Sequence, residues 1–316
     1  MTDDARYAAP PADSPYGQGT SPAQGLPSSA APAPGAAPVP DSSYAPPSPR
    51  GEWRRTVSVF GALLSRDMRV LLRFPVNFLL RTLINPFMFV FVFTFVYPKI
   101  GAGSFGAVHG QNLATVALPG LVGSAIFFQG LNGVALPLSM EFGASREIED
   151  RVMTPAPFAV TALAKVVFSA IQSVLAAGIV FVLSYFIPET PVELDVANWP
   201  LLIAAIVLGS LLAGFVGLFL GTVIDVRQVA VVFSVTIVPL TFLGCVYYPW
   251  AMLHHIPWLQ ILVLANPLVY VSEVLRASLT PDLPAMSVAA SLPALIAVTA
   301  LLGFASTRTF TRRVLS

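Results

Sequence analysis

Residues 201–224 read LLIAAIVLGSLLAGFVGLFLGTVI, a run without a single charged side chain. A helix of about 20 apolar residues crosses the roughly 30 Å hydrocarbon core of a bilayer. A helix also satisfies its own backbone hydrogen bonds inside lipid. The run therefore predicts a transmembrane helix. The whole chain, with 55% hydrophobic and only 10% charged residues among 316, has the composition of a membrane protein.

Six segments have the length and apolar character of a membrane-spanning helix, and the sequence predicts an all-α integral membrane protein. They cover residues 77–97, 113–137, 160–187, 201–224, 228–247 and 287–306. The stretch 247–279 is also apolar, but the prolines at 249, 257 and 267 divide it into pieces too short to cross. We expect a re-entrant hairpin on the outer side of the membrane there.

The positions of Lys and Arg orient these predicted spans, because cytoplasmic segments are enriched in basic residues. With both termini inside, 15 of the 17 basic residues lie at the cytoplasmic side, and only Lys99 and Arg276 lie outside. The loop between the third and fourth spans holds three acidic residues and no basic one. We therefore expect a multi-pass protein of the cell's inner (plasma) membrane with both termini in the cytoplasm.

The N-terminal part has a different composition. Residues 1–50 hold 12 of the 29 prolines and few large aliphatic side chains, so little burial offsets the entropy of ordering them. They predict a disordered, Pro/Ala-rich cytoplasmic tail, with a proline-rich docking peptide as the alternative. Residues 53–74 then carry apolar side chains at helical spacing, with arginines mostly off that stripe. This pattern predicts an amphipathic interfacial helix on anionic lipid, or alternatively a packed soluble helix, before the membrane domain at 77–316.

Charge gathers in EFGASREIEDRVMTPAP, residues 141–157, where six of the eleven positions from Glu141 to Arg151 are charged. At the bilayer centre each charge would cost about 2.5 to 3.5 kcal/mol, so the segment lies outside the hydrocarbon. On a helix its apolar and charged side chains fall on opposite sides, and Pro155 stops the helix. We predict a short cytoplasmic amphipathic helix at 141–154. It is either a docking surface for another protein or a solvated connection.

This charged segment, together with ANPLVYVSEVLR at residues 265–276, resembles the permease subunits of type-2 ABC exporters, including those of the daunorubicin-resistance type. These are the half-transporters of bacterial drug efflux and of polysaccharide or teichoic-acid export, and the resemblance covers residues 53–316. It implies that 141–154 is the coupling helix, which docks on a separate ABC ATPase subunit. It also implies a second permease copy, in a homodimer. By position, its polar contacts are Glu141, Arg146, Glu147, Glu149, Asp150 and Arg151, and its packing face is Ile148 and Val152.

Other sequence features limit the chemistry of this chain. It has no GxxxxGK[ST] motif, so we expect ATP and Mg²⁺ on the partner ATPase and no cofactor on this chain. A net charge of +1 provides no basic field for nucleic acid. The adjacent His254 and His255 would point about 100° apart on a helix, so we expect no metal site. An intramembrane enzyme, the alternative class, would need convergent acids or histidines in the spans.

Three polar residues are candidates for a substrate path or gate. Gln172 lies deep in the third predicted span, and Glu273 and Arg276 are one helical turn apart and should pair at the outer membrane surface. Lys165, near the inner end of the third span, should extend to the headgroups. The expected function is outward transport of a hydrophobic or amphipathic drug or natural product by alternating access. Export of a polysaccharide, teichoic acid or glycolipid is the alternative.

Overall fold

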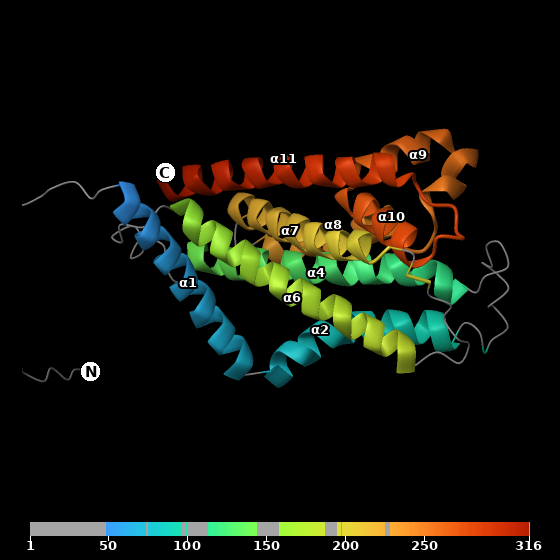
Figure 1. Cartoon of the computed structure of the whole chain (residues 1–316), viewed down its shortest axis with the longest axis horizontal. Helices are drawn as coiled ribbons and strands as arrows, with labels where there is room; N and C mark the ends of the chain where they lie inside the picture. The colour runs from blue at the N-terminus through green and yellow to red at the C-terminus, as the bar shows by residue number, and fades with distance from the viewer. Residues whose placement is uncertain are drawn as a thin grey trace, which may run out of the picture. The chain divides into compact units, whose positions relative to one another are not determined.

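A computed structural model describes residues 49–73, 75–96, 99, 113–143, 158–186, 195–196, 198–224 and 228–315. Throughout these residues the regular secondary structure is helical (Figure 1), which confirms the predicted all-α class. All of them belong to one unit of mutually packed residues, Ser48–Ser316. The predicted tail, apart from its last two residues, lies outside the described part of the chain.

The helices lie in the predicted order, with some different bounds. The long ones are α1 (Pro49–Arg73), α2 (Pro75–Val90) with its π-helical continuation η1 (Phe91–Val96), α4 (Leu113–Gly143), α6 (Phe158–Phe186), α7 (Trp199–Val223), α8 (Val229–Phe242) and α11 (Val288–Leu315). Between α8 and α11 come the shorter η3 (Trp250–His255), α9 (Pro257–Leu262), η4 (Val263–Ala265) and α10 (Pro267–Leu279).

Four of these helices, α4, α6, α7 and α11, are long and apolar enough to cross a membrane, and a bent pair could add a fifth within the described residues. The bent pair is Pro257–Ala265 with Pro267–Leu279, which meet at 102°. Asn266 stands at the bend and caps α10, because its Oδ1 accepts from the backbone N–H of Leu268 at 3.0 Å. The bend agrees with a proline-broken hairpin.

The predicted span at 228–247 differs most from the structure. Its helix α8 has 14 residues, fewer than the about 20 that a crossing needs. Side chains bind the carbonyls at its end: Asn266 Nδ2 donates to Leu240 O and Tyr248 Oη to Phe242 O, both at 2.7 Å. Such bonds satisfy helix-terminal acceptors inside the fold, so the chain can turn before it completes a span.

Helix α4 is the centre of the packing. It is buried along nearly its whole length, whereas few residues of α11 are buried, and it packs against α6, α7 and α10. Small residues bring α4 and α7 close together, as in many membrane helix pairs. A Cβ added at Gly130 would lie 2.4 Å from the Cβ of Ala213, and one added at Gly217 would lie 2.9 Å from the carbonyl oxygen of Leu131. The α4–α7 contact therefore depends on glycine.

Gly130→Ala is expected to lower the free energy of unfolding by about 1 to 3 kcal/mol, because the added methyl group forces α4 and α7 apart. Gly178→Ala on α6 is the matched control, since a Cβ there meets nothing within 4 Å. The control should match the natural protein or exceed it by about 0.5 to 1 kcal/mol through better helix propensity. Unfolding by SDS titration in mixed micelles measures both. Equal stability of the two variants would contradict the close α4–α7 contact.

Candidate functional site

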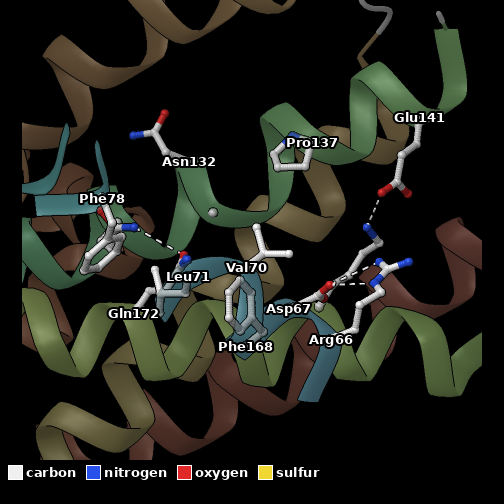
Figure 2. Close-up of a pocket in the computed structure, with 13 residues that line it drawn as sticks. Arg66, Asp67, Val70, Leu71, Phe78, Asn132, Pro137, Glu141, Phe168 and Gln172 are labelled. Atoms are coloured by element: carbon white, nitrogen blue, oxygen red, sulfur yellow. Dashed lines mark hydrogen bonds and ion pairs between the residues drawn. The ribbon is translucent and has the colours of Figure 1, made fainter. Parts of the chain in front are cut away.

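A cavity of about 550 Å³ lies between α1, α2, α4 and α6 (Figure 2). Its apolar lining includes Val70 and Leu71 of α1, Phe78 of α2 and Phe168 of α6. Its polar lining forms two groups, one of charged side chains and one of side-chain amides. The cavity is therefore amphipathic, with polar groups that come from helices far apart in the sequence.

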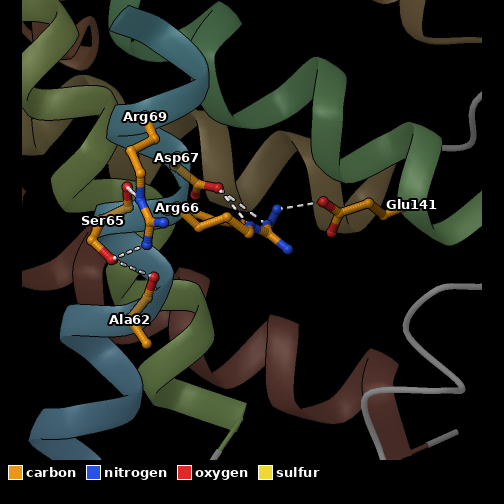
Figure 3. Close-up of polar contacts among 7 residues, drawn as sticks. Ala62, Ser65, Arg66, Asp67, Arg69 and Glu141 are labelled. Carbon is orange, nitrogen blue, oxygen red and sulfur yellow. Dashed lines mark hydrogen bonds and ion pairs between the residues drawn. The ribbon is translucent and has the colours of Figure 1, made fainter. Parts of the chain in front are cut away.

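Ion pairs form the charged end of the cavity. Lys165 Nζ lies 2.6 Å from Glu141 Oε1, and the side chains are only 14% and 16% exposed. On α1, Arg66 Nη2 lies 3.1 Å from Asp67 Oδ1, and here the Arg66 side chain is 55% exposed (Figure 3). Lys165 thus pairs with an acid of the neighbouring helix, a partner that the sequence did not predict. A facing carboxylate compensates an ammonium group that is largely removed from solvent.

The Glu141–Lys165 pair joins the two helices that flank the charged cytoplasmic segment. Glu141 lies in the last turn of α4, which ends at Gly143, and Lys165 lies in the second turn of α6, which begins at Phe158. The carboxylate of Glu141 points toward the cavity (Figures 2 and 3), and its Oε1 is the atom that lies 2.6 Å from Lys165 Nζ. The other residues of the predicted coupling surface lie outside the described residues: Arg146, Glu147, Ile148, Glu149, Asp150, Arg151 and Val152.

Side-chain amides form the other end of the cavity. Thr82 Oγ1 of α2 donates to Gln129 Oε1 of α4 at 3.1 Å, and Gln129 Nε2 donates to Gln172 Oε1 of α6 at 3.3 Å. Gln172 is only 9% exposed. A Cβ added at Gly133 would lie 2.9 Å from Gln172 Oε1, so this glycine makes room for the amide. Gln172, a path candidate from the sequence, therefore both links helices and lines the cavity.

The second polar cluster surrounds Glu273 and Arg276 on α10. Both side chains are completely buried, and Arg276 Nη1 donates to Glu273 Oε1. The expected ion pair is present, and it lies inside the fold, with both side chains inaccessible to solvent. The other partners of the two side chains are backbone groups. Arg276 Nη2 donates to Cys245 O at 3.0 Å. The two carboxylate oxygens of Glu273 accept from the N–H groups of Trp250 and Met286, at 2.9 and 2.8 Å.

This cluster connects three parts of the chain that are distant in sequence. Cys245 belongs to the turn after α8 and has a φ of 51°, a left-handed conformation that side-chain-bearing residues seldom adopt. Trp250 begins η3, and Met286 lies in the loop before α11. One buried ion pair thus holds the turn, η3 and the loop against α10. This arrangement indicates a structural role for Glu273 and Arg276 beside any role in gating.

Sequence reasoning missed Gln129, Asn132, Arg66 and Asp67 as cavity residues, and missed the partner of Lys165. One signal was present: the second predicted span is followed by an acid at Glu141, and a lysine stands near the start of the third span. Antiparallel neighbouring helices would place these two at the same end. Across the described residues, no three His, Cys, Asp or Glu side chains are grouped so that they could hold a metal ion.

Comparison with known protein families matches residues 58–280 to the ABC-2 type transporter family. This range runs from α1 through α10 and contains the cavity and the buried ion pair. No curated protein matched the sequence. The matched domain is the transmembrane subunit of an ABC transporter and not its ATPase, so the family implies a separate ATPase partner. The chain therefore belongs to the ABC-2 type transporter family and is an integral membrane subunit of an ABC transporter.

Proposed function

We propose that this subunit exports a hydrophobic or amphipathic molecule, such as a drug or natural product, by alternating access. The family match over residues 58–280 carries this proposal, because it identifies a transport subunit. The amphipathic cavity supports the substrate class, since apolar side chains and amides line one volume. ATP and Mg²⁺ act on the partner ATPase. Two copies of the permease form the path across the plasma membrane, and both termini face the cytoplasm.

The segment between α4 and α6 is the proposed coupling element. The ATPase would contact the charged side chains between Arg146 and Arg151, with Ile148 and Val152 packed into its groove. The 2.6 Å pair between Glu141 and Lys165 supports this role, because it ties the last turn of α4 to the second turn of α6. A displacement of the connecting segment would then move both helices together. Glu141 would then have two roles: it would contact the ATPase, and through its ion pair with Lys165 it would pass the movement on to α6.

Compound-stimulated ATP hydrolysis tests the proposed function. The permease is co-purified with its ATPase and reconstituted in lipid vesicles. Amphipathic drugs are then expected to raise the rate of ATP hydrolysis and to cross the bilayer only when ATP is supplied. An ATPase variant unable to hydrolyse ATP is the control. Stimulation by lipid-linked glycans, without any by drugs, would replace drug efflux by polymer or glycolipid export.

A further inference from the structure

We propose that the cavity between α1, α2, α4 and α6 binds an uncharged amphiphile from the inner leaflet. Hydroxyl or carbonyl groups of the ligand would contact the amides of Gln172 and Asn132, and its apolar body would lie against Phe78 and Phe168. The proposal rests on the export function proposed above and narrows its substrate class.

The size and lining of the cavity suit such a ligand. Its volume of about 550 Å³ lies within the roughly 300 to 1,000 Å³ of sites for small molecules. Figure 2 shows Asn132, Gln172 and Phe78 toward one end and Glu141 and Arg66 toward the other. Amides and an aromatic ring therefore lie together at one end of the wall, where one ligand could contact both, and the charged side chains lie at the other end.

The amides at one end have hydrogen-bonding capacity to spare. Gln172 Oε1 accepts from Gln129, but within the described part of the chain no acceptor takes the hydrogens of Gln172 Nε2. Asn132 Nδ2 donates to Phe128 O at 2.8 Å, and its Oδ1 accepts from no described group. A ligand hydroxyl can both donate and accept, so it could serve the donor of Gln172 and the acceptor of Asn132.

The charges of the cavity favour an uncharged ligand. Its two cations and two carboxylates are joined in the pairs Arg66–Asp67 and Lys165–Glu141. A charged ligand would compete for one member of a pair and disrupt that pair. For Lys165 and Glu141, whose side chains are at most 16% exposed, this would be costly. The net formal charge of these four groups is zero, so the described lining residues supply no excess charge to attract an ion.

The position of α1 connects the cavity with the membrane. This helix is the predicted interfacial helix, and Val70 and Leu72 near its end are 58% and 70% exposed. Such apolar exposure suits contact with lipid. Under the orientation predicted from Lys and Arg, the charged end of the cavity lies toward the cytoplasm. An amphiphile in the inner leaflet could therefore reach the cavity beside α1 without crossing water.

Photo-crosslinking in the assembled transporter tests the proposal. The full complex in lipid nanodiscs is irradiated with an alkyl glucoside that carries a diazirine, and labelled peptides are located by mass spectrometry. Label is expected on α1, α2 and α6 around the cavity. Unmodified dodecyl glucoside, added before irradiation, should reduce this labelling by competing for the cavity. Dodecyltrimethylammonium and dodecyl sulfate should not reduce it. Label spread evenly over lipid-facing helices, or equal displacement by the charged detergents, would overturn the proposal.

Substitution of the amides gives a second measure. The double variant Gln172→Leu, Asn132→Leu should reduce cavity labelling about tenfold, as expected for the loss of two neutral hydrogen bonds. Gln228→Leu is the matched control, because this exposed amide precedes α8 and lies outside the cavity. Its labelling should equal that of the natural protein. Unchanged labelling of the double variant would exclude the amides as the recognition groups.

The export function and the cavity site can fail separately. If alkyl glucosides label the cavity but no amphiphile stimulates ATP hydrolysis or transport, the site stands and the export proposal is wrong. If amphiphiles stimulate hydrolysis and transport but none labels the cavity, export stands and the site proposal is wrong.

Discussion

Glu273→Gln is expected to lower the free energy of unfolding by about 3 to 5 kcal/mol, because it leaves the guanidinium group of Arg276 buried without its carboxylate. Both side chains are completely inaccessible to solvent, so water cannot replace the lost partner. The carboxylate also accepts the N–H groups of Trp250 and Met286 on different oxygens. Glutamine offers one oxygen, and its amide nitrogen would face a second donor. SDS titration of the purified protein in mixed micelles measures the loss.

An exposed ion pair of the same chemistry provides the control. Asp67→Asn breaks the Arg66–Asp67 pair, in which Arg66 is 55% exposed, and should cost at most about 1 kcal/mol. Adding Arg276→Met to Glu273→Gln should recover part of the lost stability, because the uncompensated charge is gone. If Glu273→Gln were as stable as Asp67→Asn, the ion pair would not hold η3 and the flanking loops in place.

Exchanging the charges at Glu147 and Arg151 is expected to abolish coupled transport while the permease still inserts in the membrane. The variant Glu147→Lys, Arg151→Glu keeps an i,i+4 pair of opposite charges, so the predicted helix retains its support of about 0.2 to 0.5 kcal/mol. The surface offered to the ATPase, however, has its charges inverted, and like charges would meet across the interface. Co-purification of the ATPase and transport in vesicles are the measurements.

A second charge reversal tests whether the location matters. Asp282→Lys changes an exposed residue in the loop between α10 and α11, at the opposite end of α11 from the last turns, where Phe310 and Arg313 contact Phe142. It should leave ATPase association and transport near those of the natural protein. Normal transport by the Glu147 and Arg151 variant would show that this segment does not transmit the ATPase movement.

Much of the fold could be predicted because bilayer dimensions and helix periodicity act on short stretches of sequence. The apolar runs that form α4, α6, α7 and α11 are long enough to cross a membrane. The amphipathic pattern of 53–74 predicted a helix, and the structure has a helix there that ends at Arg73. The prolines of 247–279 predicted a broken segment, and in the structure its two helical pieces meet at 102°. The end of α8 could not be predicted, because Asn266 and Tyr248, which bind its last carbonyls, lie beyond it in the chain.

The site was predictable only in part. Gln172, Glu273 and Arg276 attract attention as polar residues in apolar surroundings, and the structure places all three in polar clusters. The Glu273–Arg276 pair forms as expected, and the structure adds that both side chains are buried inside the fold. Spacing along α10 shows that the two side chains can meet, whereas the backbone groups that complete their bonds come from the turn after α8 and the loop before α11.

The sequence by itself determined the class of protein, the apolar helices, the absence of a phosphate-binding loop and the charged segment between two spans. These properties depend on composition and on neighbours within a few turns of one helix. Only the tertiary structure decided which polar side chains meet: Lys165 with Glu141, Gln172 with Gln129, and Glu273 with the N–H groups of Trp250 and Met286. Such contacts depend on how the helices pack. That packing rests on close approaches such as Gly130 against Ala213, which no local pattern reveals.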